Sequence, residues 1–589
     1  MNDKIRSILH TAWNEPRHFF FWLAMLSICG FAAAAGGAAL VGTKLLLAFL
    51  ALGCALCFAI SVPAFILAWI PPVRRLFSWG LRWRFVVLGS LVTLVALFYA
   101  VEDWRGRSAW QDYKRAGEAK GERFDWASVA PPAVPNDQNF FETPLWNDLH
   151  FVETNRVAEW SDTNWENRVI FSVYGPTMGN NAPNTGGWTK GQHVDLAAWQ
   201  AYYRGSNNLF TAQSGPATNY FPIAKESQTP AADVLLALSR FETNRQLLIA
   251  ASARPQARFW VNYDAGFASL LPHLARMKGC SQFLALHADA ALKAGDRETA
   301  LQDINLLFCL MEASRSEPTV ISHLVRIAME QIALQPVWEG LADRRWNEAD
   351  LVALEGALRK MDFLADYQFA MRGERACNLW AVDFIRKAGI SGLNEMGVSE
   401  SDAGPTDLDQ FLGRAAFELI PAGWFDQNKL SLCRLHDKYL LPLAGDADRR
   451  VVRPATIQHA NSAIEQQRMR PYDALSKLLL PALGRFAEKC ARAQSSVDLA
   501  RVACALERYR LVNGQFPDNL ETLAPKFIEK LSSDVINGQP LKYRRSDDGQ
   551  FVLYSVGLNE TDDGGQIALT KSGNADINKG DWVWRYPAR

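Results

Sequence analysis

The sequence lacks the short motifs by which several classes of enzyme are usually detected. It contains no His-Glu-x-x-His zinc motif, no Gly-x-Ser-x-Gly nucleophile turn and no Gly-x-x-x-x-Gly-Lys phosphate loop. Its nine histidines are dispersed, and we expect the His436–Asp437 pair on a helix surface. These absences lower the expectation of an enzyme without removing it, because the members of a catalytic triad meet only in the fold. The sequence therefore assigns no catalytic or cofactor-binding residue.

An excess of charge of either sign is also missing. Lysine plus arginine equals aspartate plus glutamate, at 62 each, and the basic residues do not gather in one stripe. Because nucleic-acid-binding surfaces carry a basic surplus, this balance argues against a nucleic-acid partner. A chain of 589 residues is too long for one hydrophobic core, so we expect two or more globular units.

The cysteines show no spacing typical of a metal site in the soluble part. Cys54-x-x-Cys57 lies within an apolar run, where two small buried residues are a better interpretation than a redox or zinc pair. An oxidising compartment permits disulfides, but wide spacing and helical context favour buried free thiols for most of the others. These are Cys280, Cys309, Cys377, Cys433, Cys490 and Cys504.

Long apolar runs are present near the N-terminus. Residues 19–41 carry no charge, Lys44 follows, and residues 45–70 form a second uncharged run with a proline at Pro63. Residues 85–101 form a third, shorter run. Because about 20 apolar helical residues cross the ~30 Å hydrocarbon core, we predict three transmembrane helices within residues 1–104. The alternative is a signal peptide that is cleaved near the alanines at 32–35.

The positions of lysine and arginine predict the orientation of these helices. Basic residues precede the first run and lie between the second and third, whereas only Lys44 lies between the first and second. Since cytoplasmic flanks carry the positive excess, the N-terminus is predicted in the cytoplasm and the chain from Glu102 onward outside it, at the inner membrane. The lipid bilayer is thus one expected partner. Arg105 and Arg107 run against this pattern, partly balanced by Glu102 and Asp103.

Residues 105–227 read as a loop-rich aromatic segment. Prolines, glycines and asparagines interrupt any long periodicity. The tryptophans of this segment suit core packing better than a sugar-stacking platform, because a tryptophan usually serves as bulky packing with one hydrogen bond. They are Trp126, Trp146, Trp160, Trp165, Trp188 and Trp199.

Residues 228–387 show helical spacing and predict a layer of helical hairpins. Asp296 is an expected N-cap after a tight turn at Gly295, Ser316 and Pro318 an expected helix start, and Asn347 a further N-cap. Residues 291–303 look like one tetratricopeptide unit. An irregular bundle is the better interpretation, because no second copy appears at the 34-residue period. A linker at 388–410 and further helices at 411–494 follow.

Residues 495–589 predict a small α+β domain. A helix ends at Asn513-Gly514, a short turn lies between Pro517 and Pro525, and strands are expected at 541–545 and 551–556. The predicted fold is therefore multidomain, with N-terminal transmembrane helices, a mostly α-helical soluble region and this C-terminal domain.

This last segment resembles the globular domain of the major pseudopilins of type II secretion systems. The resemblance covers about the last 95 residues and rests on the order of its motifs: 506–509, 513–517, 538–543, 553–557, 562–565 and 576–582. The pilin processing motif and the long hydrophobic assembly helix are missing, so filament assembly is not implied. In that family the final loop binds calcium, which prefers oxygen ligands. The resemblance implies as ligands Asn559, Asp562, Asp563, Asp576 and Asp581; a solvated acidic loop is the alternative.

Two further stretches, 130–135 and 580–584, resemble large uncharacterised membrane proteins of the Verrucomicrobia and Planctomycetes. The leading hypothesis is a membrane-anchored extracytoplasmic scaffold that binds a protein partner in the cell envelope and is associated with secretion. The rival hypothesis is an extracytoplasmic hydrolase acting on polysaccharide or peptide, which paired carboxylates in a deep cleft would favour.

Overall fold

The computed structural model describes most of residues 79–587, and before them only 21, 24–25, 58–59, 61–63 and 65–66. The gaps after residue 79 are 150, 155–156, 161–170, 176–181, 211–217, 390–391, 393–416, 418, 445–449, 469 and 481–482. The described part is mostly helical, with a small sheet region near the C-terminus. It divides into two compact units. The anchor unit comprises 1–122, 381–432 and 469–478, and the body unit comprises 123–380, 433–468 and 479–589.

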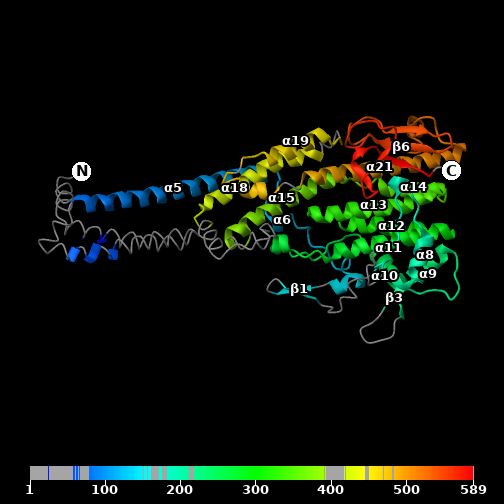
Figure 1. Ribbon diagram of the computed structural model, residues 1–589, viewed down its shortest axis with the longest axis horizontal. Coiled ribbons are helices and arrows are strands. Elements are labelled where there is room, and N and C mark those ends of the chain that lie inside the picture. Colours follow the sequence, from blue (N-terminus) through cyan, green and yellow to red (C-terminus); the bar gives the residue numbers. More distant parts are fainter. Residues whose placement is uncertain are drawn as a thin grey trace. The chain divides into compact units, whose positions relative to one another are not determined.

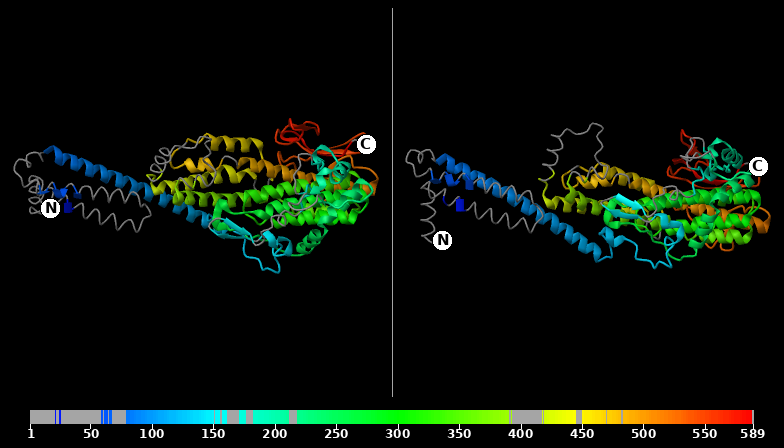
Figure 2. Two further views of the ribbon diagram at one scale, coloured as in Figure 1. Left: turned by 60° about the horizontal axis from the view of Figure 1, so that its bottom comes forward. Right: turned by 90° about the horizontal axis from the view of Figure 1, so that it is seen from below.

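The anchor unit is built on one uninterrupted helix, α5 (Trp79–Glu118), drawn in blue in Figures 1 and 2. Its segment Val86–Glu118 is the one helix, among the described residues, that is long and apolar enough to cross a membrane. The third predicted run, 85–101, lies in this helix. The first two predicted runs lie largely outside the described residues, although the rings of Phe21 and Phe65, one from each run, are 6.0 Å apart.

The expectation of loops from residue 105 is wrong for residues 105–118, which continue α5. The reason is tertiary, because Gly106 and Trp110 are buried in the anchor unit and keep the helix packed after its apolar run ends. The unit also contains the first part of α18 (Ala422–Leu435), the end of α15 (Phe363–Ala388) and α20 (Ala474–Leu479).

The body unit has a helical layer in which α11 (Pro272–Ala294), α12 (Arg297–Ala313) and α13 (Val320–Ala342) lie side by side (Figures 1 and 2). The predicted α11–α12 hairpin is confirmed. Gly295 ends α11 in the left-handed region at φ 87°, and the Asp296 carboxylate accepts the Thr299 N–H at 3.1 Å. Such a cap stabilises a helix start by about 1 kcal/mol.

The next two helices show one confirmed cap and one displaced start. Asn347 forms a capping box with Asp350 at the start of α14 (Glu348–Leu358), as predicted. The expected start at Ser316 and Pro318 is wrong by a few residues, because α13 begins at Val320 with Thr319 as its cap. Ser316 is engaged elsewhere, since its hydroxyl donates to the Ala257 carbonyl at 3.2 Å.

Short elements surround this layer. Trp126, Trp146, Trp188 and Trp199 are all buried, which confirms core packing for these four; the side chains of Trp160 and Trp165 lie outside the described ones. The elements before α11 are α6 (Trp126–Val129), η1 (Pro144–Leu149), the paired β1 (Phe151–Thr154) and β2 (Val157–Trp160), η2 (Trp188–Lys190), α8 (Leu196–Arg204), η3 (Ser206–Asn208), the paired β3 (Leu209–Phe210) and β4 (Thr218–Asn219), α9 (Pro230–Leu238), η4 (Ser239–Phe241), α10 (Glu242–Ser252) and η5 (Tyr263–Ala268).

Helix α21 (Gly484–Asn513) crosses the predicted domain boundary at Ser495 without a break and packs against α13 and α14. It ends at Gly514, with φ 77°, as predicted. Most of the predicted linker at 388–410 lies outside the described residues. The remaining body helices are η6 (His436–Leu440), η7 (Leu441–Ala444), α19 (Pro454–Glu465) and η8 (Leu520–Leu523).

The C-terminal sheet confirms the two predicted strands, β5 (Lys542–Arg545) and β6 (Phe551–Ser555), and adds β9 (Trp582–Arg585) on the other side of β6. Both pairings are antiparallel. A separate hairpin pairs β7 (Ile567–Leu569) with β8 (Ala575–Gly580). The sheet buries Trp584 completely, and its ring centroid lies 5.2 Å from that of Trp188 in η2, so the sheet shares its core with the rest of the body unit.

Candidate functional site

Two cavities that share one lining residue lie along α12 in the body unit. The first, the cap cavity, has a volume of about 660 Å³ and lies beside the starts of α12 and α14. Its lining comprises Ile249, Ser252, Arg297, Glu298, Leu301, Gln302, Asn305, Leu306, Cys309, Asn347, Ala349 and Asp350.

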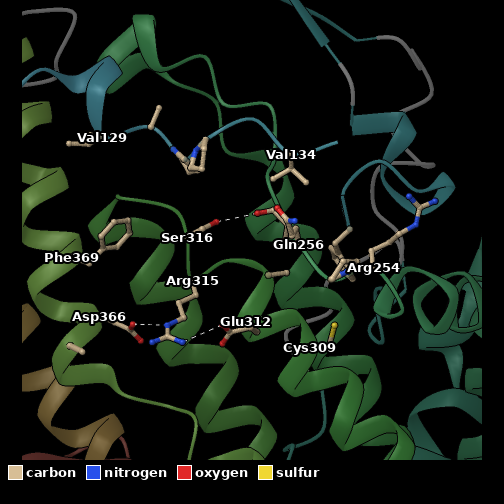
Figure 3. A pocket seen from close by; sticks show the side chains of 18 of the residues that line it. Val129, Val134, Arg254, Gln256, Cys309, Glu312, Arg315, Ser316, Asp366 and Phe369 are labelled. Atoms are coloured by element: carbon tan, nitrogen blue, oxygen red, sulfur yellow. Dashed lines mark hydrogen bonds and ion pairs between the residues drawn. The ribbon is translucent and has the colours of Figure 1, made fainter. Parts of the chain in front are cut away.

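The second, the strap cavity, has a volume of about 690 Å³ and lies under the proline-rich segment 129–134 (Figure 3). Apart from this strap, its lining comes from Arg123, Phe140, residues 254–257, the end of α12 with the turn after it, and the start of α15. Figure 3 shows Val129 and Phe369 on one side of the cavity and the Cys309 sulfur on the other. Prolines, valines, alanines and phenylalanines make most of the lining apolar.

Cys309, in the last third of α12, lines both cavities, so they adjoin at this residue. Arg297, Leu301, Asn305, Cys309 and Glu312 follow one another at intervals of three or four residues, which places them on one face of the helix. From Arg297 to Ala313 the axial length of α12 is ~24 Å at 1.5 Å per residue. This continuous face and its walls are called the α12 groove below.

One arginine organises the charges at the strap end of the groove. Arg315 donates to Asp366 at 3.0 Å and to Glu312 at 3.3 Å (Figure 3). Asp366 also accepts a hydrogen bond from the buried Arg326. Glu312 and Asp366, the two carboxylates that line this cavity, are therefore both bound to a guanidinium. This pairing differs from the spaced acid and base that a glycoside hydrolase cleft requires.

The middle and the cap end of the groove present polar groups. Gln302 accepts a hydrogen bond from Arg245 at 2.8 Å, and its amide nitrogen donates none within the described part of the chain. The exposed Asn305 side chain also makes no hydrogen bond to any described residue. At the cap end Arg297 pairs with Asp350. The groove floor thus offers two amides between two charged ends.

A buried serine, glutamate and histidine lie in contact, but the order of their contacts does not suit nucleophilic catalysis. Glu317 accepts from Ser322 at 2.5 Å and contacts the His273 ring nitrogen at 2.6 Å, so the carboxylate lies between the hydroxyl and the imidazole. In a catalytic triad the imidazole lies between the other two groups. Phe259 stacks on His273 at 4.0 Å. This cluster holds α11 to the turn before α13.

His436 corrects a second expectation, because it is fully buried rather than on a helix surface. Neither ring nitrogen has a hydrogen-bond partner among the described residues. Burial, aided by the nearby Arg375, lowers the pKa of His436 to about 3. Asp437, by contrast, is half exposed and pairs with Arg375 at 3.1 Å. The two neighbours therefore have opposite environments.

Two buried glutamates of the body unit carry raised pKa values. Burial raises the pKa of Glu330, on α13, to about 8, although Gln331 donates to it at 2.7 Å and Arg492 of α21 lies near. Burial likewise raises the pKa of Glu374, on α15, to about 7. Neither glutamate lines the α12 groove. Their protonation therefore bears on stability rather than on the groove.

Four of the five predicted calcium ligands lie in the loop before β7 or are hydrogen-bonded to it. Asp581 accepts the Gly565 N–H at 2.7 Å and the Asp563 N–H at 3.3 Å. Asn559 donates to Asp563 at 2.8 Å. Burial raises the pKa of Asp581 above its usual value. These contacts bring together Asn559, Asp563 and Asp581 with the neighbouring Asp562.

The chain's own donors also contact Asp562 and the fifth predicted ligand, Asp576. Asp562 accepts the Tyr554 hydroxyl at 2.9 Å and pairs with Lys542 at 3.3 Å; the tyrosine bond lowers the pKa of Asp562. Asp576 lies on β8 and accepts the Asn578 N–H at 3.1 Å. No three His, Cys, Asp or Glu side chains in the described part of the chain are placed to hold a metal ion. In this arrangement the carboxylates of the loop accept hydrogen bonds from the chain's own donors.

The described cysteines behave as predicted. All six are free, and burial raises the pKa of Cys309 to about 11. Sequence reasoning did not find the α12 groove. The signal present in the sequence was the row of exposed polar residues at Gln302, Asn305 and Glu312, which departs from a fully packed helix.

Comparison of the chain with protein-family models, with curated proteins and with solved structures finds no match.

Proposed function

We propose that this protein is anchored in a membrane by α5 and binds an extended polypeptide segment of a cell-envelope partner in the α12 groove. The observation that carries the proposal is the groove itself, with its apolar cavity, the Asn305 amide and the Gln302 amide nitrogen that are free among the described residues, and its charged ends. In this proposal α5 crosses a bilayer, with the N-terminus in the cytoplasm and the chain after α5 outside it, in accord with the lysine and arginine positions.

The exposure of α5 supports anchoring. No described side chain between Val86 and Val101 is buried, and the large apolar ones are mostly exposed, as at Val87, Leu91, Leu94, Leu97 and Val101. A soluble helix buries at least one apolar stripe, whereas a membrane helix is apolar all round. Exposed apolar surface on this scale marks an interaction surface, and the length of the helix suits the hydrocarbon core of a bilayer.

The size and chemistry of the groove support a polypeptide occupant. A length of ~24 Å matches on the order of seven extended residues at 3.3 Å each. Asn305 and Gln302 match the alternating N–H and C=O groups of an extended backbone. The apolar strap cavity has room for a large side chain such as tryptophan or leucine, and buried aromatic anchors dominate the affinity of such interfaces.

Selection from a random decapeptide library against the full chain in detergent micelles tests this function. Asn305→Arg fills the middle of the groove with a long charged side chain. Gln246→Arg is the matched control, because Gln246 is exposed on α10 and does not line the groove. We expect peptides that bind the wild type and Gln246→Arg with equal Kd and bind Asn305→Arg at least tenfold more weakly. Equal binding to both variants, or no enriched peptide, would overturn the proposal.

For residues 495–589 we propose a pseudopilin-like module associated with secretion. The order of α21, η8 and the sheet, and the left-handed Gly514 between helix and turn, agree with the resemblance. Calcium belongs to this proposal as a stabilising ion. Binding requires Asp562 and Asp563 to exchange their present donors for the metal.

A further inference from the structure

The start of α18 lies against α5 at the point where the apolar run of α5 ends. A Cβ atom on Gly106 would overlap the Gly423 carbonyl, and one on Gly423 would overlap the backbone of Glu102. The two helices can approach this closely only because both positions are glycine. Residues more than three hundred positions apart are therefore fixed together within the anchor unit.

Hydrogen bonds determine which residues of α5 the start of α18 contacts. Asp103 accepts the Gly423 N–H at 2.8 Å, which caps α18, and Glu102 accepts the Trp424 indole N–H at 2.9 Å. The Tyr99 hydroxyl donates to the Leu419 carbonyl at 2.5 Å. The segment 419–424 thus lies beside residues 99–103.

Large apolar side chains are exposed at this level. Trp104 is 71% exposed and Leu419 is 49% exposed. The rings of Phe98 and Trp424 meet edge to face with centroids 6.4 Å apart. Past this level the environment changes, because Trp110 is buried and Lys429 lies over its ring at 5.0 Å. We call Phe98, Trp104, Leu419 and Trp424 the collar.

The level of the collar matches the headgroup layer of a bilayer. Trp104 lies ~4.5 Å beyond Val101 along the helix axis at 1.5 Å per residue. The headgroup layer extends about 5 to 7 Å beyond the hydrocarbon on each side. Trp110, ~13 Å beyond Val101, lies outside this layer. Tryptophan prefers this layer, and the exposed Arg105 and Arg107 are placed to meet lipid phosphates.

We propose that the start of α18 is a second membrane contact, in which Leu419 and Trp424 enter the headgroup layer of the bilayer at the level of Trp104. This inference rests on the proposed anchoring by α5. It adds that a segment 320 residues away from Tyr99 in sequence touches the same lipid surface.

The test uses the full chain in liposomes with an environment-sensitive NBD label on an introduced cysteine. The variants are Leu94→Cys in the apolar run, Trp104→Cys and Leu419→Cys in the collar, and Gln111→Cys as an exposed control on α5. Wild-type chain taken through the same labelling supplies the background from native cysteines. Lipids with a shallow or a deep nitroxide and aqueous iodide are the quenchers.

We expect the shallow nitroxide to quench the labels at positions 104 and 419 at least twofold more than the label at 111, and iodide to show the reverse order. Iodide quenching at 419 equal to that at 111, with deep-nitroxide quenching at 94 retained, overturns the collar and leaves the anchor standing. Loss of quenching at 94 overturns the anchor and the collar together. Adding Gly423→Ala, which forces α18 away from α5, should reduce lipid quenching at 419 and keep it at 104.

Discussion

Arg326 donates to the carboxylate of Asp366 inside the body unit, where its side chain is 1% exposed, and the same carboxylate accepts from Arg315 at 3.0 Å at the wall of the strap cavity. Asp366 thus connects the buried Arg326 to Arg315, which lies on the surface that we assign to partner binding. A change at Asp366 therefore affects stability and the groove together.

Asp366→Ala should destabilise the protein by about 3–5 kcal/mol, because it leaves the buried Arg326 without its counter-ion. Glu312→Ala is the matched control, since Glu312 binds the same Arg315 but its side chain is 60% exposed. An exposed pair contributes about 0–1 kcal/mol. Thermal unfolding of the two variants in detergent micelles measures the difference. Equal losses of stability would contradict the buried pairing.

Gly373→Ala and Gly356→Ala should change stability in opposite directions. A Cβ on Gly373, in α15, would overlap the Pro318 carbonyl, whereas nothing lies within 4 Å of a Cβ on Gly356, in α14. We expect Gly373→Ala to cost about 1–3 kcal/mol through overpacking. Gly356→Ala should add about 0.5–1 kcal/mol, because alanine loses less backbone entropy in a helix. Chemical denaturation of both variants measures their free energies of unfolding. Changes of the same sign in the two variants would refute the close contact at Gly373.

Local residue patterns predicted much of the helical layer. The caps at Asp296 and Asn347 and the helix end at Gly514 depend on neighbours within a few positions, so the sequence carries their full signal. The continuation of α5 past Glu102 was not predictable in this way. Its charged residues find their partners on α18, as Glu102 does with the Trp424 indole.

The α12 groove was not predictable for the same physical reason. Ser252 on one wall and Asp350 on the other are about a hundred residues apart and meet around α12 only in the fold. The predicted calcium ligands show the converse case. Sequence proximity gathered Asn559, Asp562 and Asp563, but it did not reveal that Tyr554 and Lys542 supply donors to the loop.

Calcium should raise the melting temperature of the full chain if it binds the folded loop, since a ligand that binds only the folded state stabilises it by mass action. Asp562→Ala and Asp563→Ala should each abolish the rise. Asp547→Ala is the control, because Asp547 is an exposed aspartate in the β5–β6 turn, outside the loop. Identical melting curves with calcium and with chelator would show that the loop remains satisfied by its own donors.

We expect the free energy of unfolding to fall as the pH rises, because of Glu330. Its folded-state pKa of about 8 lies above the unfolded value near 4.5, so the folded state binds the proton more tightly. The stabilisation from this group is fully present below about pH 4.5 and is lost as the pH rises through about 8, by up to about 5 kcal/mol at 1.4 kcal/mol per pKa unit.

Glu330→Gln removes this titration and keeps the size and hydrogen-bonding capacity of the side chain. We expect the variant to match the wild type near pH 5 and to exceed it in stability at pH 9, measured as the free energy of unfolding in denaturant at each pH. Glu298→Gln is the control, since the Glu298 side chain is 89% exposed and should leave the profile unchanged. If the wild type and Glu330→Gln give parallel profiles from pH 5 to 9, Glu330 is already ionised in the folded state, with the nearby Arg492 as its counter-ion.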